Sequence, residues 1–211
     1  MRTVRQTNFF PGSSVVLVCS AMLIQALPAF GEEPLPAGVT RAAEATIGND
    51  IAQFTYFTPA PINGVQSSLD YGALIANSRQ FIGTTALLFR SDLGILANFE
   101  LDAGPKAYLA LLQGTGTAKS DVAAISVGAS ARFDLYPPWG VAVFGSFFYS
   151  PNVLTFGSAN NIYDLTAGAE ARLASHLVAV GGYRWLKFTI ELQSDNRLSN
   201  ELFVGIRWQF H

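Results

Sequence analysis

The chain ends on a strict alternation of apolar residues with residues of other kinds. In the last eleven residues, ELFVGIRWQFH, the apolar positions are Leu202, Val204, Ile206, Trp208 and Phe210. The positions between them hold Phe203, Gly205, Arg207 and Gln209. Successive side chains of a β-strand point to opposite faces. The pattern therefore predicts a strand with one apolar face and one wetter face, the first turned toward lipid and the second toward water.

The same period of two recurs in two earlier segments. In 121–134 one face holds Ile125, Val127, Ala129, Ala131 and Phe133, and the other holds Ser126, Gly128, Ser130, Arg132 and Asp134. In 161–174 one face holds Tyr163, Leu165, Ala167, Ala169, Ala171 and Leu173, and the other holds Asp164, Thr166, Gly168, Glu170 and Arg172. Such a gapless apolar face suits either a packed core or a lipid surface.

Turn clusters divide the rest of the chain into strand-like segments. They predict strands at 41–48, 51–58, 67–77, 80–90, 97–112, 121–134, 139–150, 161–174, 176–193 and 201–210. The first turn, Asn49-Asp50, suits a two-residue hairpin. If it is only a bulge, an even strand number gives eight strands in place of ten. No run of 18 apolar residues predicts a membrane-spanning helix.

Connection lengths favour a closed membrane barrel over a β-sandwich. In the second half of the chain the connections alternate between long and short. The long ones are 113–120, 151–160 and 194–200, and the short ones are 136–138 and 174–176. Outer-membrane barrels have long external loops and short periplasmic turns. The predicted fold is a closed antiparallel up-and-down transmembrane β-barrel over 41–211, in which every backbone polar group finds a partner inside the sheet.

Aromatic residues gather near the ends of the predicted strands. They are Tyr56, Phe57, Tyr71, Phe81, Tyr136, Trp139, Tyr149, Tyr163, Trp208 and Phe210. Tyr and Trp favour the headgroup zone of a bilayer, where the ring and the polar tip both find partners. Composition agrees, because 50% of the residues are apolar and only 13% are charged. The formal net charge of −2 and the lack of a Lys/Arg run give no basis for nucleic-acid binding.

The N-terminal segment has the pattern of a secretory signal peptide over 1–31. Arg2 and Arg5 precede the apolar segment 15–24, and small residues at 29 and 31 predict cleavage after Gly31. Residues 32–40 predict a short tether, and 41–211 the barrel. The alternatives are an uncleaved membrane anchor and, more remotely, a lipoprotein at Cys19. Cys19 is the single cysteine, so the exported chain needs no disulfide.

Candidate catalytic or cofactor chemistry is sparse, and we expect no enzyme, cofactor or metal site. The segment LALLQGTGTAKS (109–120) lacks the Gly before Lys119 and the following helix that a phosphate-binding loop needs. The histidines are His176 and His211. Ser175 and His176 are sequence neighbours, and neighbours on a strand point to opposite faces, which does not favour a nucleophile–base pair.

The charges on the polar faces are the more informative set. We expect a lumen network of Arg132, Asp134, Glu170, Arg172, Arg184, Lys187, Glu191 and Arg207, with Glu201 on the same face. In 176–193 the expected inward residues Lys187, Thr189 and Glu191 alternate with Phe188, Ile190 and Leu192. That phase places Arg184 toward lipid, so a bulge near Trp185-Leu186 is predicted to turn Arg184 inward and Trp185 outward.

Several short motifs carry a family resemblance. They are Lys106-Ala107-Tyr108, Phe148-Tyr149-Ser150-Pro151-Asn152 before Phe156-Gly157, Gly182-Tyr183-Arg184, and Leu202-Phe203-Val204-Gly205-Ile206-Arg207 with Phe210. As a set, over roughly 45–211, they resemble the YfaZ-type outer-membrane proteins. The resemblance implies a small outer-membrane barrel without established catalytic residues. Such barrels often end on an aromatic residue, so Trp208 and Phe210 are expected to signal to the barrel-assembly machinery. His211 follows that end.

The functional expectation is a Gram-negative outer-membrane barrel with a side-chain-filled lumen and a structural or interaction role. Opposite charges on neighbouring strands of a narrow barrel should pair and fill it. The alternatives are a narrow passive, porin-like channel, a lipid-modifying enzyme and a soluble periplasmic β-domain. The expected partners are outer-membrane lipid and the barrel-assembly machinery. The oligomeric state stays open.

Overall fold

The computed structural model describes residues 41–76, 80–91, 98–113, 119–136, 140–157, 159–190 and 193–210. The chain divides into the units Met1–Leu35 and Pro36–His211, and the strands belong to the second. The predicted signal peptide and tether lie outside the described residues. The strands are β1 (Arg41–Gly48), β2 (Ile51–Pro59), β3 (Ser67–Ala76), β4 (Gln80–Ser91), β5 (Phe99–Gln113), β6 (Lys119–Tyr136), β7 (Val141–Ser150), β8 (Thr155–Gly157), β9 (Ala159–Ala174), β10 (Leu177–Ile190) and β11 (Gln193–Phe210).

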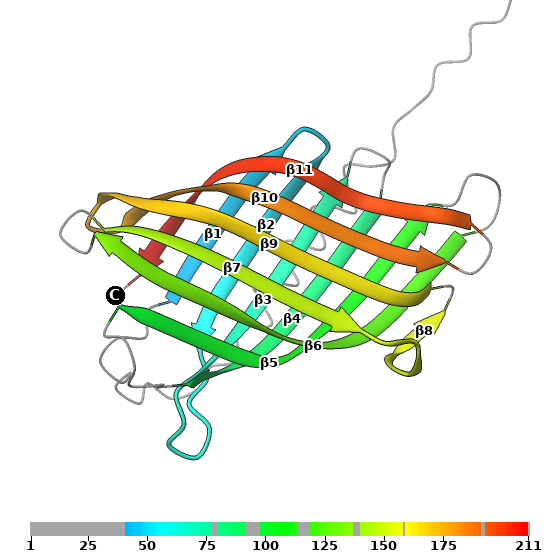
Figure 1. Ribbon diagram of the computed structural model, residues 1–211, viewed down its shortest axis with the longest axis horizontal. Coiled ribbons are helices and arrows are strands. Elements are labelled where there is room, and N and C mark those ends of the chain that lie inside the picture. The colour runs from blue at the N-terminus through cyan, green and yellow to red at the C-terminus, as the bar shows by residue number, and fades with distance from the viewer. Residues whose placement is uncertain are drawn as a thin grey trace, which may run out of the picture. The chain divides into compact units, whose positions relative to one another are not determined.

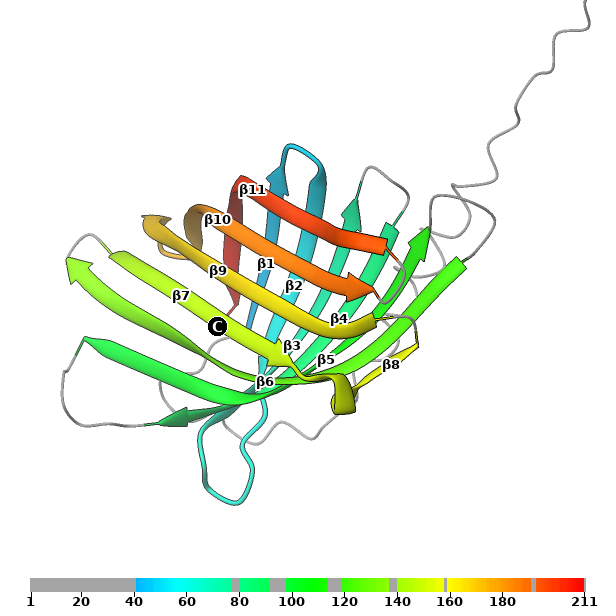
Figure 2. The same cartoon turned by 45° about the vertical axis from the view of Figure 1, so that its right-hand side comes forward.

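The sheet is a closed antiparallel barrel of ten wall strands, as predicted (Figure 1; Figure 2). Its order is β5-β4-β3-β2-β1-β11-β10-β9-β7-β6, and β6 pairs back with β5. The first and last strands join in register, with Arg41 opposite Phe210 and Gly48 opposite Phe203. Asn49 and Asp50 connect β1 to β2, which confirms the hairpin and the count of ten in place of eight. Within the described residues, no helix is long and apolar enough to cross a membrane.

The short strand β8 arises where the wall strand β7 stops. After Ser150 the chain makes a 3-10 turn, η2 (Asn152–Leu154), and β8 then pairs with the part of β6 beyond β7. Two buried hydroxyl groups stabilise this break. Ser150 Oγ donates to the Ile125 carbonyl oxygen at 2.9 Å, and Thr155 Oγ1 donates to the Pro151 carbonyl oxygen at 3.0 Å. The predicted loop 151–160 is therefore largely ordered structure against the barrel wall.

The two ends of the barrel are distinguished by the chain termini. The end that holds Arg41 and Phe210 is called the terminal end, and the opposite one the distal end. At the terminal end, the β2–β3 connection turns through Asn63 and Gly64, both at positive φ, between the bridged residues Ile62 and Val65. Such a turn favours Asn and Gly because they tolerate left-handed backbone.

The outer face of the barrel is apolar, and the exposed residues on it confirm the predicted alternation. On β11, Leu202 is 72% exposed and Val204 63% exposed, whereas Phe203 between them is 4% exposed. On β6 and β9 the predicted apolar rows likewise face out, and Ser126, Asp164 and Glu170 face in and are buried. A membrane barrel needs this arrangement, with apolar residues outside and polar residues inside.

Aromatic rings mark the outer face toward both ends. At the terminal end, Trp208 and Phe210 are about half exposed, and Tyr56 and Tyr71 are register partners on β2 and β3. Toward the distal end, the ring centroids of Tyr149 and Tyr163 are 4.9 Å apart, and Tyr163 and Trp185 follow at 6.0 Å. Two aromatic girdles around an apolar band are typical of outer-membrane barrels.

Two local predictions are wrong. The segment 194–200, predicted as an external loop, belongs to β11, which begins at Gln193. The pairing of β10 with β9 runs without a shift through Trp185 and Leu186, so the predicted bulge is not there. The irregularity lies on the β11 side instead, where Leu186 is opposite Ser199 and Lys187 is opposite Arg197. Of the predicted loop 113–120, Gln113 and Lys119 are strand residues, and 114–118 lie outside the described residues.

Candidate functional site

The inward side chains of the barrel fall into two levels along its axis. Charged residues gather toward the terminal end, and apolar residues gather toward the distal end. We call the first set the terminal network: Glu44, Arg90, Glu100, Asp102, Arg132, Asp134, Glu170 and Arg207. We call the second set the apolar layer: Ile51, Leu74, Ile82, Tyr108, Ala110, Val122, Ala124, Ala159, Ile162, Leu186 and Phe188.

Glu170 on β9 is the centre of the terminal network. Its Oε1 accepts from Arg132 Nε at 2.6 Å, and its Oε2 accepts from Arg207 Nη1 at 2.7 Å. Arg132 reaches it across β7, where the register neighbour of Glu170 is the small, fully buried Ala142. Arg207 reaches it across β10, where the register neighbour is Val180. Small side chains on the intervening strands thus leave room for the two guanidinium groups.

The network continues from Glu170 in both directions around the wall. On one side, Arg207 Nη2 lies 2.7 Å from Glu44 Oε2, and the two residues are register partners on β11 and β1. On the other side, Arg132 contacts Asp134 at 2.7 Å and approaches Glu100 at 3.8 Å. Opposite charges therefore cross-link several strands that are not hydrogen-bonded neighbours.

The part of the network on β4 and β5 is more exposed to solvent. Arg90 on β4 bonds Asp102 at 3.2 Å and lies 3.5 Å from Glu100. The Glu100 side chain is 38% exposed, whereas that of Glu170 is 5% exposed. The network as a whole combines five carboxylates with three guanidinium groups, a formal excess of two negative charges. The side chains of the network are therefore buried around Glu170 and partly exposed to solvent around Glu100.

A second polar cluster lies between the network and the apolar layer. Asp164 Oδ2 accepts from Lys106 Nζ at 2.7 Å and from the Tyr108 hydroxyl at 2.7 Å. Asp164 is almost fully buried, so these two donors supply the partners that a carboxylate needs away from bulk water. Nearby, the buried Arg184 guanidinium lies 4.9 Å from the centre of the Phe203 ring.

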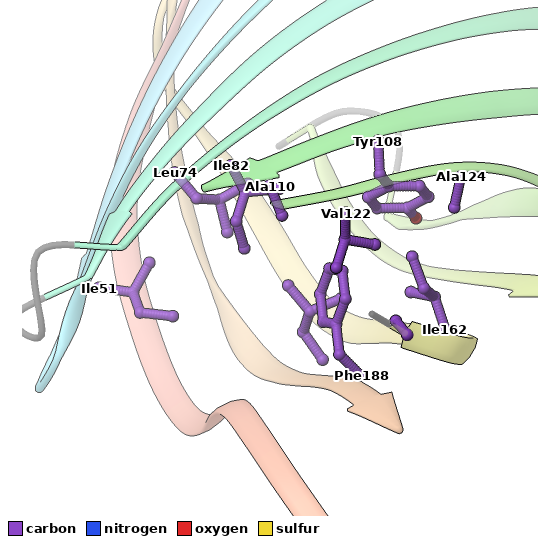
Figure 3. Close-up of a cluster of buried hydrophobic side chains, with 11 residues drawn as sticks. Ile51, Leu74, Ile82, Tyr108, Ala110, Val122, Ala124, Ile162 and Phe188 are labelled. Atoms are coloured by element: carbon purple, nitrogen blue, oxygen red, sulfur yellow. The ribbon is translucent and has the colours of Figure 1, made fainter. Parts of the chain in front are cut away.

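The apolar layer fills the lumen toward the distal end (Figure 3). Its eleven residues come from seven strands, and each of them is at most 5% exposed. Phe188 and Ile162 are completely buried, and the Tyr108 ring meets the Phe188 ring edge-on at 6.5 Å. Figure 3 shows Tyr108, Val122 and Phe188 close together inside the wall. Apolar side chains thus occupy a part of the lumen where charged side chains such as Lys187 were predicted.

The structure places the predicted lumen residues in different surroundings. Arg132, Asp134, Glu170 and Arg207 meet in the terminal network. Arg172 shares the polar face of β9, but its side chain is exposed at the terminal end. Trp208 and Phe210 lie on the outer face of β11. Glu191 and His211 lie outside the described residues.

Strand β10 corrects the prediction for Lys187. Arg184, Leu186 and Phe188 are all buried inside, so unbroken alternation places Lys187 and Thr189 on the outer face. Arg184 is inward and Trp185 outward, as expected, but without the predicted bulge. The expectation that Phe188 faces lipid is wrong, because the apolar face of this strand end is the inner one and packs into the layer.

Several residues of the lumen escaped the sequence prediction. They are Glu44, Arg90, Glu100, Asp102 and Lys106. Period two alone would have placed Glu100, Asp102 and Lys106 on one face of 97–112. Asp164 was placed inward but without a partner, because the sequence does not show that β5 and β9 face each other across the lumen.

The residues considered for enzyme chemistry are not assembled into a site by the described structure. Ser175 and His176 form the exposed turn between β9 and β10 at the terminal end. The His176 carbonyl oxygen accepts a hydrogen bond from the Gln209 amide at 2.8 Å. Over the described part of the chain, no group of three or more His, Cys, Asp or Glu side chains has the geometry to hold a metal ion.

The closed ten-stranded wall, its apolar outer face and its two aromatic girdles define a small outer-membrane β-barrel protein. The family described as YfaZ precursor matches residues 82–210, more than half of the chain, and the chain belongs to that family. No match to a curated protein was found.

Solved structures with a similar fold are also outer-membrane proteins. A bacterial polysaccharide outer membrane secretin aligns with a TM-score of 0.46 and 11% identity, over 76% of this chain and 57% of that one. The outer membrane channel DcaP of Acinetobacter baumannii aligns with a TM-score of 0.43 and 6% identity, over 79% and 54%. The chain thus spans little more than half the length of these two. The KdgM porin aligns with a TM-score of 0.38 and 10% identity, over 82% of this chain and 100% of that one.

Proposed function

We propose that this protein is a non-conducting outer-membrane barrel with a structural or interaction role. The observation that supports the proposal best is the apolar layer, whose eleven residues are each at most 5% exposed. In a barrel with a continuous water-filled pore, at least some of these side chains would be exposed to water. Toward the terminal end, the charged side chains of the terminal network lie next to this layer.

The physical barrier is the cost of dehydrating an ion. Hydrophobic constrictions stop conduction because water leaves them, and an ion that enters loses its hydration shell without a replacement. Phe188 and Ile162 offer no polar atom to such an ion. The polar cluster of Lys106, Asp164 and Tyr108 is already paired internally, so it does not offer a stepping site through the layer.

We assign the terminal end to the periplasm. Because the number of wall strands is even, the chain enters β1 at Arg41 and leaves β11 at Phe210 on the same side of the membrane. A chain that is exported and then inserts from the periplasm retains both termini there. The terminal network then lies toward the periplasm. The apolar layer lies under the outer surface, beneath the distal connections that are the proposed contact surface.

Planar-bilayer recording tests the proposal directly. The unaltered barrel is expected to give no stepwise conductance. The double variant Phe188→Ala/Ile162→Ala removes the bulk of two fully buried layer residues and is expected to open discrete conductance steps. Val153→Ala is the matched control, because Val153 is 82% exposed on η2 and contributes nothing to the layer.

A narrow passive channel is the second candidate, and the exposed part of the terminal network favours it. Arg90 and Glu100 have about a third of their side-chain surface in contact with solvent, as channel-lining charges do. If the unaltered barrel conducts, and Arg132→Ala raises that conductance, this candidate replaces the closed barrel. If the unaltered barrel is silent and only the layer variant conducts, the closed barrel stands.

A further inference from the structure

The outer face of the barrel carries a lysine within its distal aromatic girdle. Lys187 lies on the outer face because both of its chain neighbours, Leu186 and Phe188, are buried in the lumen. Its register partner on β9 is Tyr163, whose chain neighbours Ile162 and Asp164 are also buried inside. Among strand residues whose side chains the structure describes, the outer face carries a cation here and at Arg41, at the opposite end of the barrel.

The surroundings of Lys187 have the composition of a lipid-headgroup site. Tyr149, Tyr163 and Trp185 form a continuous ladder of rings on β7, β9 and β10, with centroid separations of 4.9 and 6.0 Å. Such rings lie at the headgroup level of a bilayer.

The exposed side chains at the distal rim, on η2 and β8, are apolar. The turn η2 and strand β8 expose Val153 (82%) and Phe156 (58%) at the same end of the barrel, and β8 contacts β9. On the outer face, Asp121 of β6 is an acidic residue of this end, but β8 and β9 lie between β6 and β10. A cation set between rings and apolar side chains fits a molecule that combines an anionic head with acyl chains.

We propose that Lys187, with the Tyr163 and Trp185 rings beside it, binds a phosphoryl group of an outer-leaflet glycolipid of the lipid A type. A lysine in the membrane lowers its free energy when its stem lies along apolar surface and its ammonium group reaches the headgroup level. There the ammonium donates charge-assisted hydrogen bonds to phosphate oxygens, which are about twice as strong as neutral ones. The rings pack against the sugar and the upper acyl chains.

The test uses the purified barrel in uncharged detergent micelles and native mass spectrometry. The probes are diphosphoryl lipid A and its chemically dephosphorylated counterpart, each titrated against the barrel. The variants are Lys187→Gln and Lys187→Arg, and the matched control is Arg41→Gln, which removes the outer-face cation of the other end. Heat-modifiable gel migration checks that each variant is folded.

The unaltered barrel and Lys187→Arg are expected to retain diphosphoryl lipid A and to bind the dephosphorylated form more weakly. Lys187→Gln is expected to weaken retention of the diphosphoryl form by about tenfold, the size of one charged hydrogen bond. Arg41→Gln should match the unaltered barrel. The proposal is overturned if Lys187→Gln and Arg41→Gln behave alike, or if both lipids bind the unaltered barrel equally. Because lipid binding is measured without any conductance, its outcome does not depend on whether the lumen is closed.

Discussion

Glu170 on β9 and Arg207 on β11 are joined across the lumen face of β10, with Arg207 Nη1 at 2.7 Å from Glu170 Oε2. The same carboxylate binds a second guanidinium group, that of Arg132 on β6, which reaches it across the inner face of β7. One buried acid thus stands between two cations, and its removal leaves both with one partner fewer.

The first prediction concerns this carboxylate. Glu170→Gln keeps the shape of the side chain but removes its charge, so the buried ends of Arg132 and Arg207 lose their shared counter-charge. Breaking a buried ion pair by removing one partner costs about 3–5 kcal/mol. Because both arginines retain a carboxylate, at Asp134 and Glu44, we expect the lower part of that range.

Equilibrium unfolding of the lipid-reconstituted barrel in urea measures the change for Glu170→Gln. Glu100→Gln serves as the control, because its side chain is 38% exposed and sits farther from its partners. Exposed ion pairs contribute about 1 kcal/mol or less. Equal losses of stability in the two variants would show that Glu170 does not hold the network together.

A second prediction separates the two donors to Asp164. Tyr108→Phe removes one of two hydrogen bonds to Oδ2 and keeps the ring in the apolar layer, so a loss of about 1 kcal/mol is expected. Asp164→Asn leaves Lys106 as a partly buried cation without its carboxylate and should cost more. Urea unfolding gives the order of the two variants, and the reverse order would contradict the assignment of Asp164 as the counter-ion of Lys106.

How far the sequence predicts the barrel depends on what the alternation of side chains along each strand can show. It records two faces for each strand, and on β6, β9 and β11 the faces differ enough in polarity to show which one is inside. It favours ten strands, because turn residues separate the segments, but the alternative of eight stayed open until the structure showed a hairpin at Asn49-Asp50. The fold class and most of the outer face follow from this information alone.

Strand β10 shows where this information ends. Its distal half carries Trp185, Lys187 and Thr189 outside and Leu186 and Phe188 inside, so the more polar face is the outer one and polarity assigns the faces the wrong way round. The phase that starts at Val178 and Val180 runs unbroken to Phe188 and gives the correct answer. The charged Lys187 misled the prediction because a lysine was assumed to point inward, although the headgroup region also accommodates its charge.

Ion-pair partners that are distant in the sequence were beyond prediction for a different reason. Lys106 and Asp164 are 58 positions apart, and Arg207 and Glu44 are 163 apart. Alternation places each of these on an inner face, but the stagger between strands decides which of them lie at the same height. That stagger becomes visible only when the barrel closes between β1 and β11.

A third prediction tests the membrane band on the outer face. Val204 is 63% exposed in the middle of the outward row of β11, between Leu202 and Ile206. An arginine there is expected to cost about 2–4 kcal/mol of folding free energy into a bilayer, because its charge lies near the midplane. Thr58→Arg, on the outward row of β2 near the terminal end, should cost about 1 kcal/mol or less, because that position lies at the interface.

Folding of the two arginine variants into phospholipid vesicles, titrated with urea, gives the difference. The two variants carry the same added charge, so their difference reports depth in the membrane. If Val204→Arg is as well tolerated as Thr58→Arg, the apolar rows of β11 do not face hydrocarbon.

The last prediction concerns the end of the chain as an assembly signal. Phe210 is the final residue of β11, 44% exposed on the outer face and opposite Arg41 in the seam that closes the barrel. Before the seam closes, its ring is available to another protein, whereas in the finished barrel it contributes only modest packing. Phe210→Ala is therefore expected to lower the amount of protein in the outer membrane of cells several-fold, while spontaneous folding into vesicles changes little. Phe54→Ala removes an equally exposed outer-face ring from the middle of β2 and controls for lost lipid contact. If both variants reduce cellular and spontaneous folding to the same extent, the terminal ring acts through lipid contact alone and the assembly role is wrong.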